Sequence, residues 1–115
     1  MAEIILIPLQ VIVERNEIFT GNKCDKEREK ALKACYGSFY YYDTVQEQIS
    51  SIILSLVKDH FFIDGNKRTA LFTYILLAEI NKLKYIKEID EQVKIFVNLA
   101  ASHNSVQETA KILFS

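Results

Sequence analysis

Residues that interrupt regular structure are scarce in this sequence. Only three glycines and one proline occur among its 115 residues, and these two residue types are the strongest local breakers of helices and strands. No internal repeat or low-complexity linker divides the chain. The scarcity predicts long helices, and the length predicts one domain over residues 1–115.

An excess of charge of one sign is also lacking. The sequence has 14 basic and 15 acidic side chains, so no overall field attracts nucleic acid or an anionic membrane. Two cysteines and two histidines, with no CxxC pair, argue against a closed zinc site. We therefore expect no direct nucleic-acid partner and no membrane partner, and any phosphate chemistry must come from a local site.

The apolar run at residues 3–13 has no basic start and no small-residue cleavage site, so it does not read as a secretion signal. Pro8 interrupts the run, which is too short to span a bilayer. We interpret it as a core element and expect a cytoplasmic protein. The two unpatterned cysteines fit a reducing compartment, and the sequence leaves a disulfide open.

Apolar spacing predicts about six helices and an all-α fold. The expected helices run from Pro8 to Phe19, from Asp25 as cap, from Thr44 with Glu47 as capping box, from Asn66 to Ile80, from Glu88 or Asp90, and from Asn104 or Ser105. Residues 71–77 are interpreted as core and not as a ligand pocket. The aromatic stretch of residues 36–43 favours an extended strand, so a small β flap is expected beside the helices.

Residues 59–71 carry the chemistry. A helix is expected to end near His60, a tight loop follows, and a buried helix begins near Asn66. The free N–H groups and the positive dipole end of such a helix start form an anion site. Lys67 and Arg68 place positive charge where the dipole favours acids, so local stability does not explain them and a bound phosphate does.

The neighbouring residues then acquire roles. Asp64 offers a carboxylate to Mg²⁺, or caps the following helix. Asn66 can donate an amide hydrogen bond to a phosphate oxygen, and Phe62 anchors the loop in the core. His60 can accept a proton from an attacking hydroxyl near neutral pH. These parts suit phosphoryl or nucleotidyl transfer, in which positioning and charge neutralisation supply most of the catalysis.

The segment resembles the signature of the Fic/Doc (fido) superfamily, HxFx[D/E]GNxxR at the start of a central helix. The matching residues are His60, Phe62, Asp64, Gly65, Asn66 and Arg68. The likeness extends over most of the chain and implies a compact helical bundle around the motif helix. It also implies ATP or another nucleoside triphosphate as co-substrate, Mg²⁺ as cofactor, His60 as general base, Asp64 as metal ligand, and Gly65, Asn66, Lys67 and Arg68 as phosphate-binding residues.

Two positions differ from the Fic members that transfer AMP, which carry a glycine and a second arginine there. Lys67 and Leu71 occupy these positions, and the run 66–71 is similar to the Doc (death-on-curing) branch, whereas Gly65 is Fic-like. The Doc resemblance implies a toxin that transfers the terminal phosphate of ATP to a threonine of elongation factor Tu. It also implies restraint by an antitoxin protein, because no inhibitory helix motif is present in the sequence.

Two other functions remain open. A Fic-type nucleotidyltransferase would attach AMP to a protein hydroxyl, and a catalytically idle fido domain would serve as a binding module. By the same resemblance, the flap before the motif helix aligns the target protein by strand addition. Phe39, Tyr40 and Tyr41 are the expected docking residues of that flap.

Overall fold

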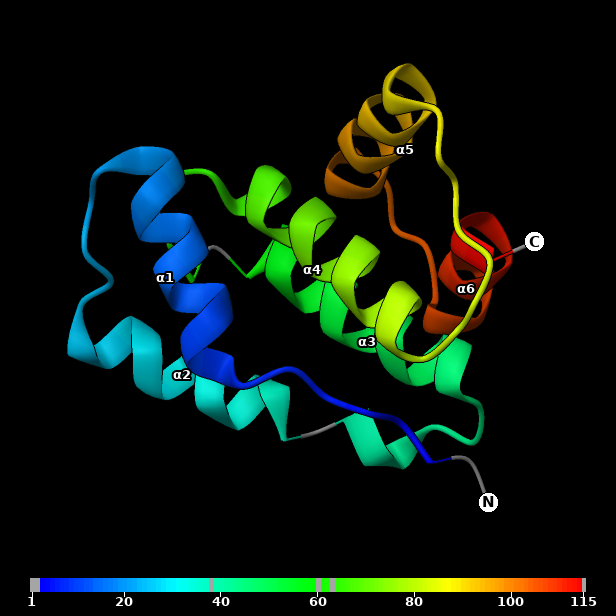
Figure 1. Cartoon of the computed structure of the whole chain (residues 1–115), viewed down its shortest axis with the longest axis horizontal. Coiled ribbons are helices and arrows are strands. Elements are labelled where there is room, and N and C mark those ends of the chain that lie inside the picture. The colour runs from blue at the N-terminus through cyan, green and yellow to red at the C-terminus, as the bar shows by residue number, and fades with distance from the viewer. Residues whose placement is uncertain (1–2, 38, 60, 63, 115) are drawn as a thin grey trace.

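Helices make up the regular structure of the protein. The computed structural model describes residues 3–37, 39–59, 61–62 and 64–114, and these residues include no strand. In chain order the elements are α1 (Leu9–Thr20), α2 (Lys26–Tyr36), the 3-10 helix η1 (Phe39–Tyr41), α3 (Val45–Lys58), α4 (Asn66–Ile80), α5 (Ile89–Ala101) and α6 (Val106–Phe114) (Figure 1). The expected all-α class is confirmed.

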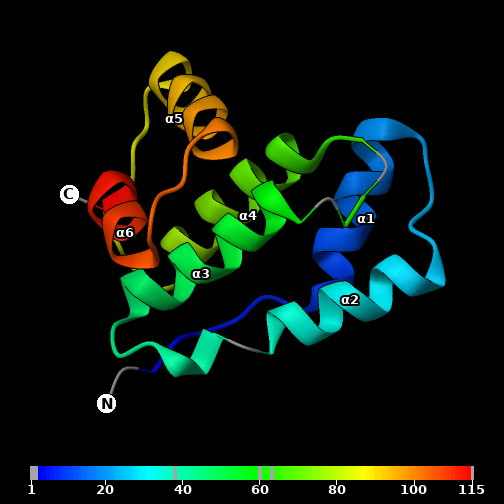
Figure 2. The same cartoon turned by 180° about the vertical axis from the view of Figure 1, so that it is seen from behind.

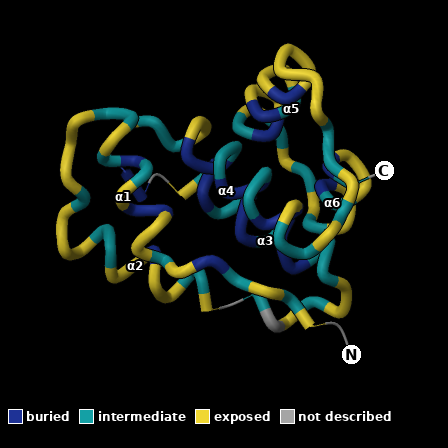
Figure 3. Tube along the Cα trace, in the orientation of Figure 1, coloured by how far each residue is buried: buried dark blue, intermediate teal, exposed yellow. Residues whose placement is uncertain are grey.

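Helices α3 and α4 lie side by side at the centre of the molecule (Figures 1 and 2). Helix α3 packs against α2, α4, α5 and α6, whereas α1 packs against α4. The predicted apolar face of α3 is confirmed, because its buried side chains recur every three or four residues: Ile49, Ile52, Ile53, Leu56 and Val57. Figure 3 shows the buried parts of the chain concentrated along these two helices.

The N-terminal segment belongs to the core, as expected. Ile7 is buried, and so are Ile12 and Val13 of α1. The side chain of Asn81, at the end of α4, accepts a hydrogen bond from the backbone N–H of Ile5 at 2.7 Å and donates one to its carbonyl at 2.9 Å. Among the described residues, no helix is both long and apolar enough to cross a bilayer.

Side chains cap three helices at their predicted starts. The Asp25 carboxylate accepts a hydrogen bond from the first turn of α2. Thr44 and Glu47 form a capping box before α3, and Ser105 and Glu108 exchange the same pair of hydrogen bonds before α6. Each cap satisfies N–H groups that the first helical turn leaves unpaired, so these boundaries follow from local sequence.

The aromatic stretch of residues 36–43 requires a correction. Tyr36 ends α2, and Phe39–Tyr41 form η1, which packs against α3. Gln48 of α3 donates its side-chain amide to the carbonyl of Tyr42 at 2.8 Å. A strand satisfies its backbone groups on a neighbouring strand, and the described part of the chain provides none. Turn and side-chain bonds take that place, so the expected extended strand is a 3-10 turn.

Candidate functional site

A cleft of about 860 Å³ opens at the start of α4. One side is polar and consists of Lys58 and residues 64–68, at the end of α3 and the first turn of α4. The other side is apolar and comes mostly from α5, through Val93, Phe96, Val97 and Ala100. The structure thus brings all of the predicted phosphate-binding residues to one cavity, together with the predicted metal ligand Asp64.

The described lining of the cleft is rich in positive charge. Its charged side chains are the basic Lys58, Lys67 and Arg68 and one carboxylate, that of Asp64. Lys58 donates a hydrogen bond from Nζ to the carbonyl of Ser102, so its charge is fixed between α3 and the end of α5. A chain with a net charge of −1 therefore carries a locally cationic cavity, which favours an anionic ligand.

The loop before α4 leaves the helix N-terminus open. Gly65 is the N-cap residue, with a φ of 74°, and no side chain of the described residues caps the helix. Asp64 does not take the capping role considered from the sequence, because its Oδ1 accepts from the N–H of Gly65 at 2.8 Å. First-turn N–H groups without a capping side chain are available to an anion.

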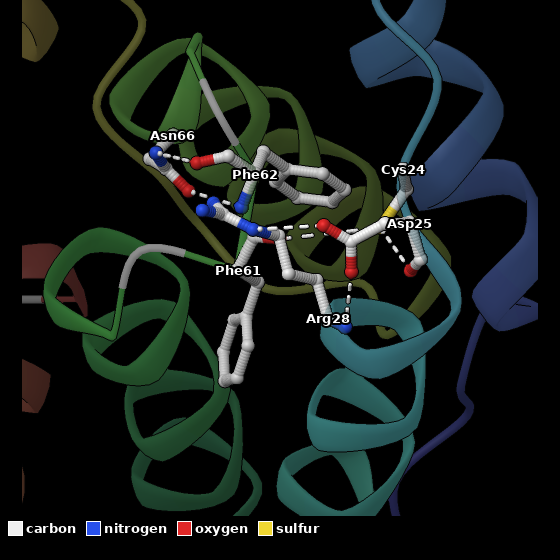
Figure 4. Close-up of polar contacts among 6 residues, drawn as sticks. All are labelled: Cys24, Asp25, Arg28, Phe61, Phe62 and Asn66. Carbon is white, nitrogen blue, oxygen red and sulfur yellow. Dashed lines mark hydrogen bonds and ion pairs between the residues drawn. The ribbon is translucent and has the colours of Figure 1, made fainter.

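Asn66 and Phe62 lock the loop to the helix (Figure 4). Asn66 donates from Nδ2 to the carbonyl of Phe62 at 2.9 Å and accepts from its N–H at 3.1 Å. Phe62 is buried, as expected of an anchor, and Cys24 Sγ lies 3.9 Å from the carbonyl of Phe61. An amide nitrogen carries two hydrogens, so Asn66 can hold the loop and still donate one hydrogen bond to a ligand.

Helix α1 supplies residues that the sequence analysis missed. Asn16 is only 2% exposed, and its Nδ2 donates to the carbonyl of Asp64 at 2.8 Å and to Thr69 Oγ1 at 3.0 Å. Its position four residues after the buried Ile12 is an available signal, because a polar residue in a core register indicates a buried partner. Ile18 of the same helix, by contrast, is 70% exposed.

Aromatic rings hold the arginines beside the cleft. The guanidinium of Arg68 lies 5.5 Å from the centre of the Phe19 ring. Arg15 lies 5.7 Å from the same ring and 4.7 Å from that of Phe72. Cation–π contacts of this kind orient a guanidinium without neutralising it. Arg68 is therefore directed from α1 while its charge stays available to a ligand.

Leu71 corrects the interpretation of residues 71–77 as core alone. This half-buried side chain lines the cleft, although Tyr74 and Leu77 of the same run are fully buried. The physical reason is helical spacing: Leu71 follows Lys67 by four residues and Arg68 by three, so all three share one side of α4.

His60 lies outside the described residues, so its role rests on the sequence. Among the residues described, no group of three or more His, Cys, Asp or Glu side chains could hold a metal ion. Asp64 nevertheless fits Mg²⁺ beside a polyphosphate, because this ion usually takes one or two protein carboxylates and fills its other positions with phosphate oxygens and water.

The family comparison matches the same part of the chain. Residues 24–78 match the sequence model of the Fic/DOC family. The matched segment includes the loop and nearly all of α4, so it contains the polar side of the cleft. The match supports the Fic/Doc superfamily and, in general terms, a transferase that modifies proteins with part of a nucleoside triphosphate. No curated protein is similar enough to the chain to count as a match.

Proposed function

We propose that this protein is a Doc-like toxin of a toxin–antitoxin pair. It transfers the terminal phosphate of ATP to a threonine or serine hydroxyl of a target protein, which is elongation factor Tu by family resemblance. One observation carries the proposal: the motif loop and the open start of α4 form the cationic side of a cleft of about 860 Å³. Cavities of this size accommodate a small-molecule ligand.

The residues of the motif have different roles in the reaction. His60 takes the proton of the target hydroxyl, whose oxygen attacks the terminal phosphorus as the bond to the ADP leaving group breaks. Lys67, Arg68 and the first N–H groups of α4 hold the phosphates, where fixed positive charge stabilises the transition state. Asn66 keeps the loop in register with the helix through its two hydrogen bonds to Phe62.

Asp64 is the residue that would hold Mg²⁺, which supplies neutralisation of the phosphate charges when bound. Its Oδ1 already accepts from Gly65 N–H, so the carboxylate is oriented before any ligand arrives. The second carboxylate oxygen remains to bind the ion. The Asp64 carboxylate is exposed and already oriented by the loop. Binding Mg²⁺ therefore costs little further side-chain freedom, which suits a metal ligand.

Leu71 favours phosphate transfer over AMP transfer. It lines the cleft in the place where AMP-transferring relatives carry a second arginine, so one cation for the polyphosphate is missing there. Lys67 likewise places a side chain where those relatives have glycine. A Fic-type nucleotidyltransferase is the alternative activity, and an idle fido domain is the alternative of another class. Docking of the target at Phe39, Tyr40 and Tyr41 stays a prediction, with Tyr41 73% exposed.

Transfer of label distinguishes these possibilities. The protein and His60→Ala are incubated with Mg²⁺, a bacterial lysate and ATP labelled at either the γ or the α phosphate. We expect a His60-dependent band of the size of elongation factor Tu from the γ label alone. A band from the α label would replace the kinase by a nucleotidyltransferase. Absence of both labels, with retained binding of a protein partner, would favour the idle binding module.

A further inference from the structure

The Asn16 side chain joins α1 to the loop in front of α4, across 48 positions of sequence. Its Nδ2 donates to the carbonyl of Asp64 at 2.8 Å and to Thr69 Oγ1 at 3.0 Å. Both hydrogens of the amide nitrogen are therefore used. One partner lies in the loop and the other in the first turn of α4, so a single side chain fixes the loop relative to the helix.

Burial of the Asn16 amide costs free energy unless its polar atoms are hydrogen-bonded. Asn16 is 2% exposed and follows the fully buried Ile12 by one helical turn. An apolar residue would pack at such a position without the desolvation cost of an amide. The hydrogen bonds offset that cost only in the observed conformation of the loop. The two hydrogen bonds of Asn16 therefore stabilise only this one conformation of residues 64–69.

The surface of α1 is also shaped to the loop. A Cβ atom at Gly65 would lie 2.8 Å from Thr20 Cγ2 and 3.2 Å from Asn16 Nδ2. Asn16 and Thr20 are four residues apart and therefore lie on one side of the helix. A side chain at residue 65 would therefore force the Thr20 methyl group or the Asn16 amide to shift, so glycine lets the loop pack closely against these two side chains of α1.

We propose that Asn16 is a positioning residue of the anion site. Because it is buried and does not line the cleft, it acts through the loop: its hydrogen bond sets the direction of the Asp64 carbonyl. That direction fixes the left-handed turn at Gly65, which aims the Asp64 carboxylate and the first N–H groups of α4 into the cleft. The inference rests on the proposed function, since it assigns this site a polyphosphate ligand.

The test replaces Asn16 by aspartate, which has nearly the same shape but no N–H group. The Thr69 hydroxyl can turn and donate to the new carboxylate, whereas the Asp64 carbonyl faces a second acceptor. The matched control is Gln10→Glu, which makes the same chemical change at an exposed position of α1, where the amide donates a hydrogen bond to Glu14. Both variants add one negative charge to the same helix.

Three quantities are measured on the full chain. Isothermal titration gives the affinity for ATP with Mg²⁺, hydrogen exchange reports peptides covering residues 61–70, and transfer kinetics separate KM for ATP from KM for the target. For Asn16→Asp we expect about tenfold weaker ATP binding and faster exchange in this segment. KM for the target should be unchanged, and Gln10→Glu should match the wild type.

The outcomes separate this inference from the proposed function. Wild-type exchange in residues 61–70 of Asn16→Asp would overturn the inference, whether or not ATP binds. Faster exchange with unchanged ATP affinity would overturn it as well, because the loop would then move without affecting the ligand. If the wild-type protein does not bind ATP while exchange in the variant rises, the polyphosphate ligand fails and the role of Asn16 in holding the loop stands.

Discussion

Gly65 concentrates two constraints in one residue. Its φ of 74° lies in the left-handed region, which costs a residue with a Cβ about 1–2 kcal/mol, and a Cβ would also approach Thr20 and Asn16 too closely. Gly21 has nearly the same φ, 73°, and its ideal Cβ would meet none of the described residues within 4 Å, chain neighbours aside. Substitutions at Gly65 and Gly21 can therefore separate the free-energy cost of backbone strain from the cost of contact with α1.

Gly65→Ala should therefore lose more stability than Gly21→Ala, and it alone should weaken ATP binding. Urea denaturation and isothermal titration on both variants measure this difference. Thr20→Ser in the Gly65→Ala background removes the methyl group at 2.8 Å and should restore part of the excess loss. Equal losses for the two alanine variants would show that the approach of α1 to the loop has no energetic consequence.

At the scale of elements, Tyr36 ties the end of α2 to the N-terminal segment. Its hydroxyl donates to the carbonyl of Ile7, and burial raises the pKa of Tyr36 to about 12. The unfolded-state pKa is about 10, so the unfolded chain ionises first as pH rises. The stabilisation is complete below pH ~10 and is lost as pH approaches ~12.

Tyr36→Phe should make stability less sensitive to alkali, although the variant loses a hydrogen bond at every pH. The midpoint of urea unfolding is compared for both proteins between pH 8 and pH 11. The midpoint of the variant should still fall with pH, because two other tyrosines also have raised pKa values. Burial raises the pKa of Tyr74, and a hydrogen bond with Glu79 raises that of Tyr85. Identical slopes in the two proteins would contradict the assigned role of Tyr36.

At the scale of the whole molecule, Tyr74 connects α4 to α6 and to α5, the helix that provides most of the apolar side of the cleft. It is fully buried in α4, donates its hydroxyl to the carbonyl of Leu113 at 2.6 Å and accepts from the N–H of Ile86 at 3.0 Å. Its ring lies 5.7 Å from that of Phe96 in α5 and 5.5 Å from that of Phe114 in α6. One side chain thus binds α4, α5 and α6 together.

Tyr74→Phe should destabilise the fold by about 1–3 kcal/mol, because it leaves the buried carbonyl of Leu113 and the part-buried N–H of Ile86 without this partner. Tyr85→Phe is the matched control, since it removes a hydroxyl that bonds an exposed Glu79 at 2.6 Å. Chemical denaturation should show the smaller loss for Tyr85→Phe. A loss as large as that of Tyr74→Phe would argue that the buried network does not hold these helices.

The sequence by itself determined the features that depend on near neighbours along the chain. Thr44 with Glu47 set the start of α3 because a capping box spans only three residues. The apolar spacing of α3 identified its buried face for the same reason. The segment from His60 to Arg68 was found as a contiguous motif, and most of its described residues line the cleft.

Only the tertiary structure decided the features that depend on distant residues. Phe39–Tyr41 became a 3-10 helix beside α3, where Gln48 donates to the carbonyl of Tyr42, and the Tyr36 hydroxyl found its partner in the N-terminal segment. Leu71 became part of the cleft wall because α5 forms the opposite side. Asn16 became part of the site through a hydrogen bond to residue 64. The local sequence pattern contains no information about such contacts, because they form only once the helices have packed together.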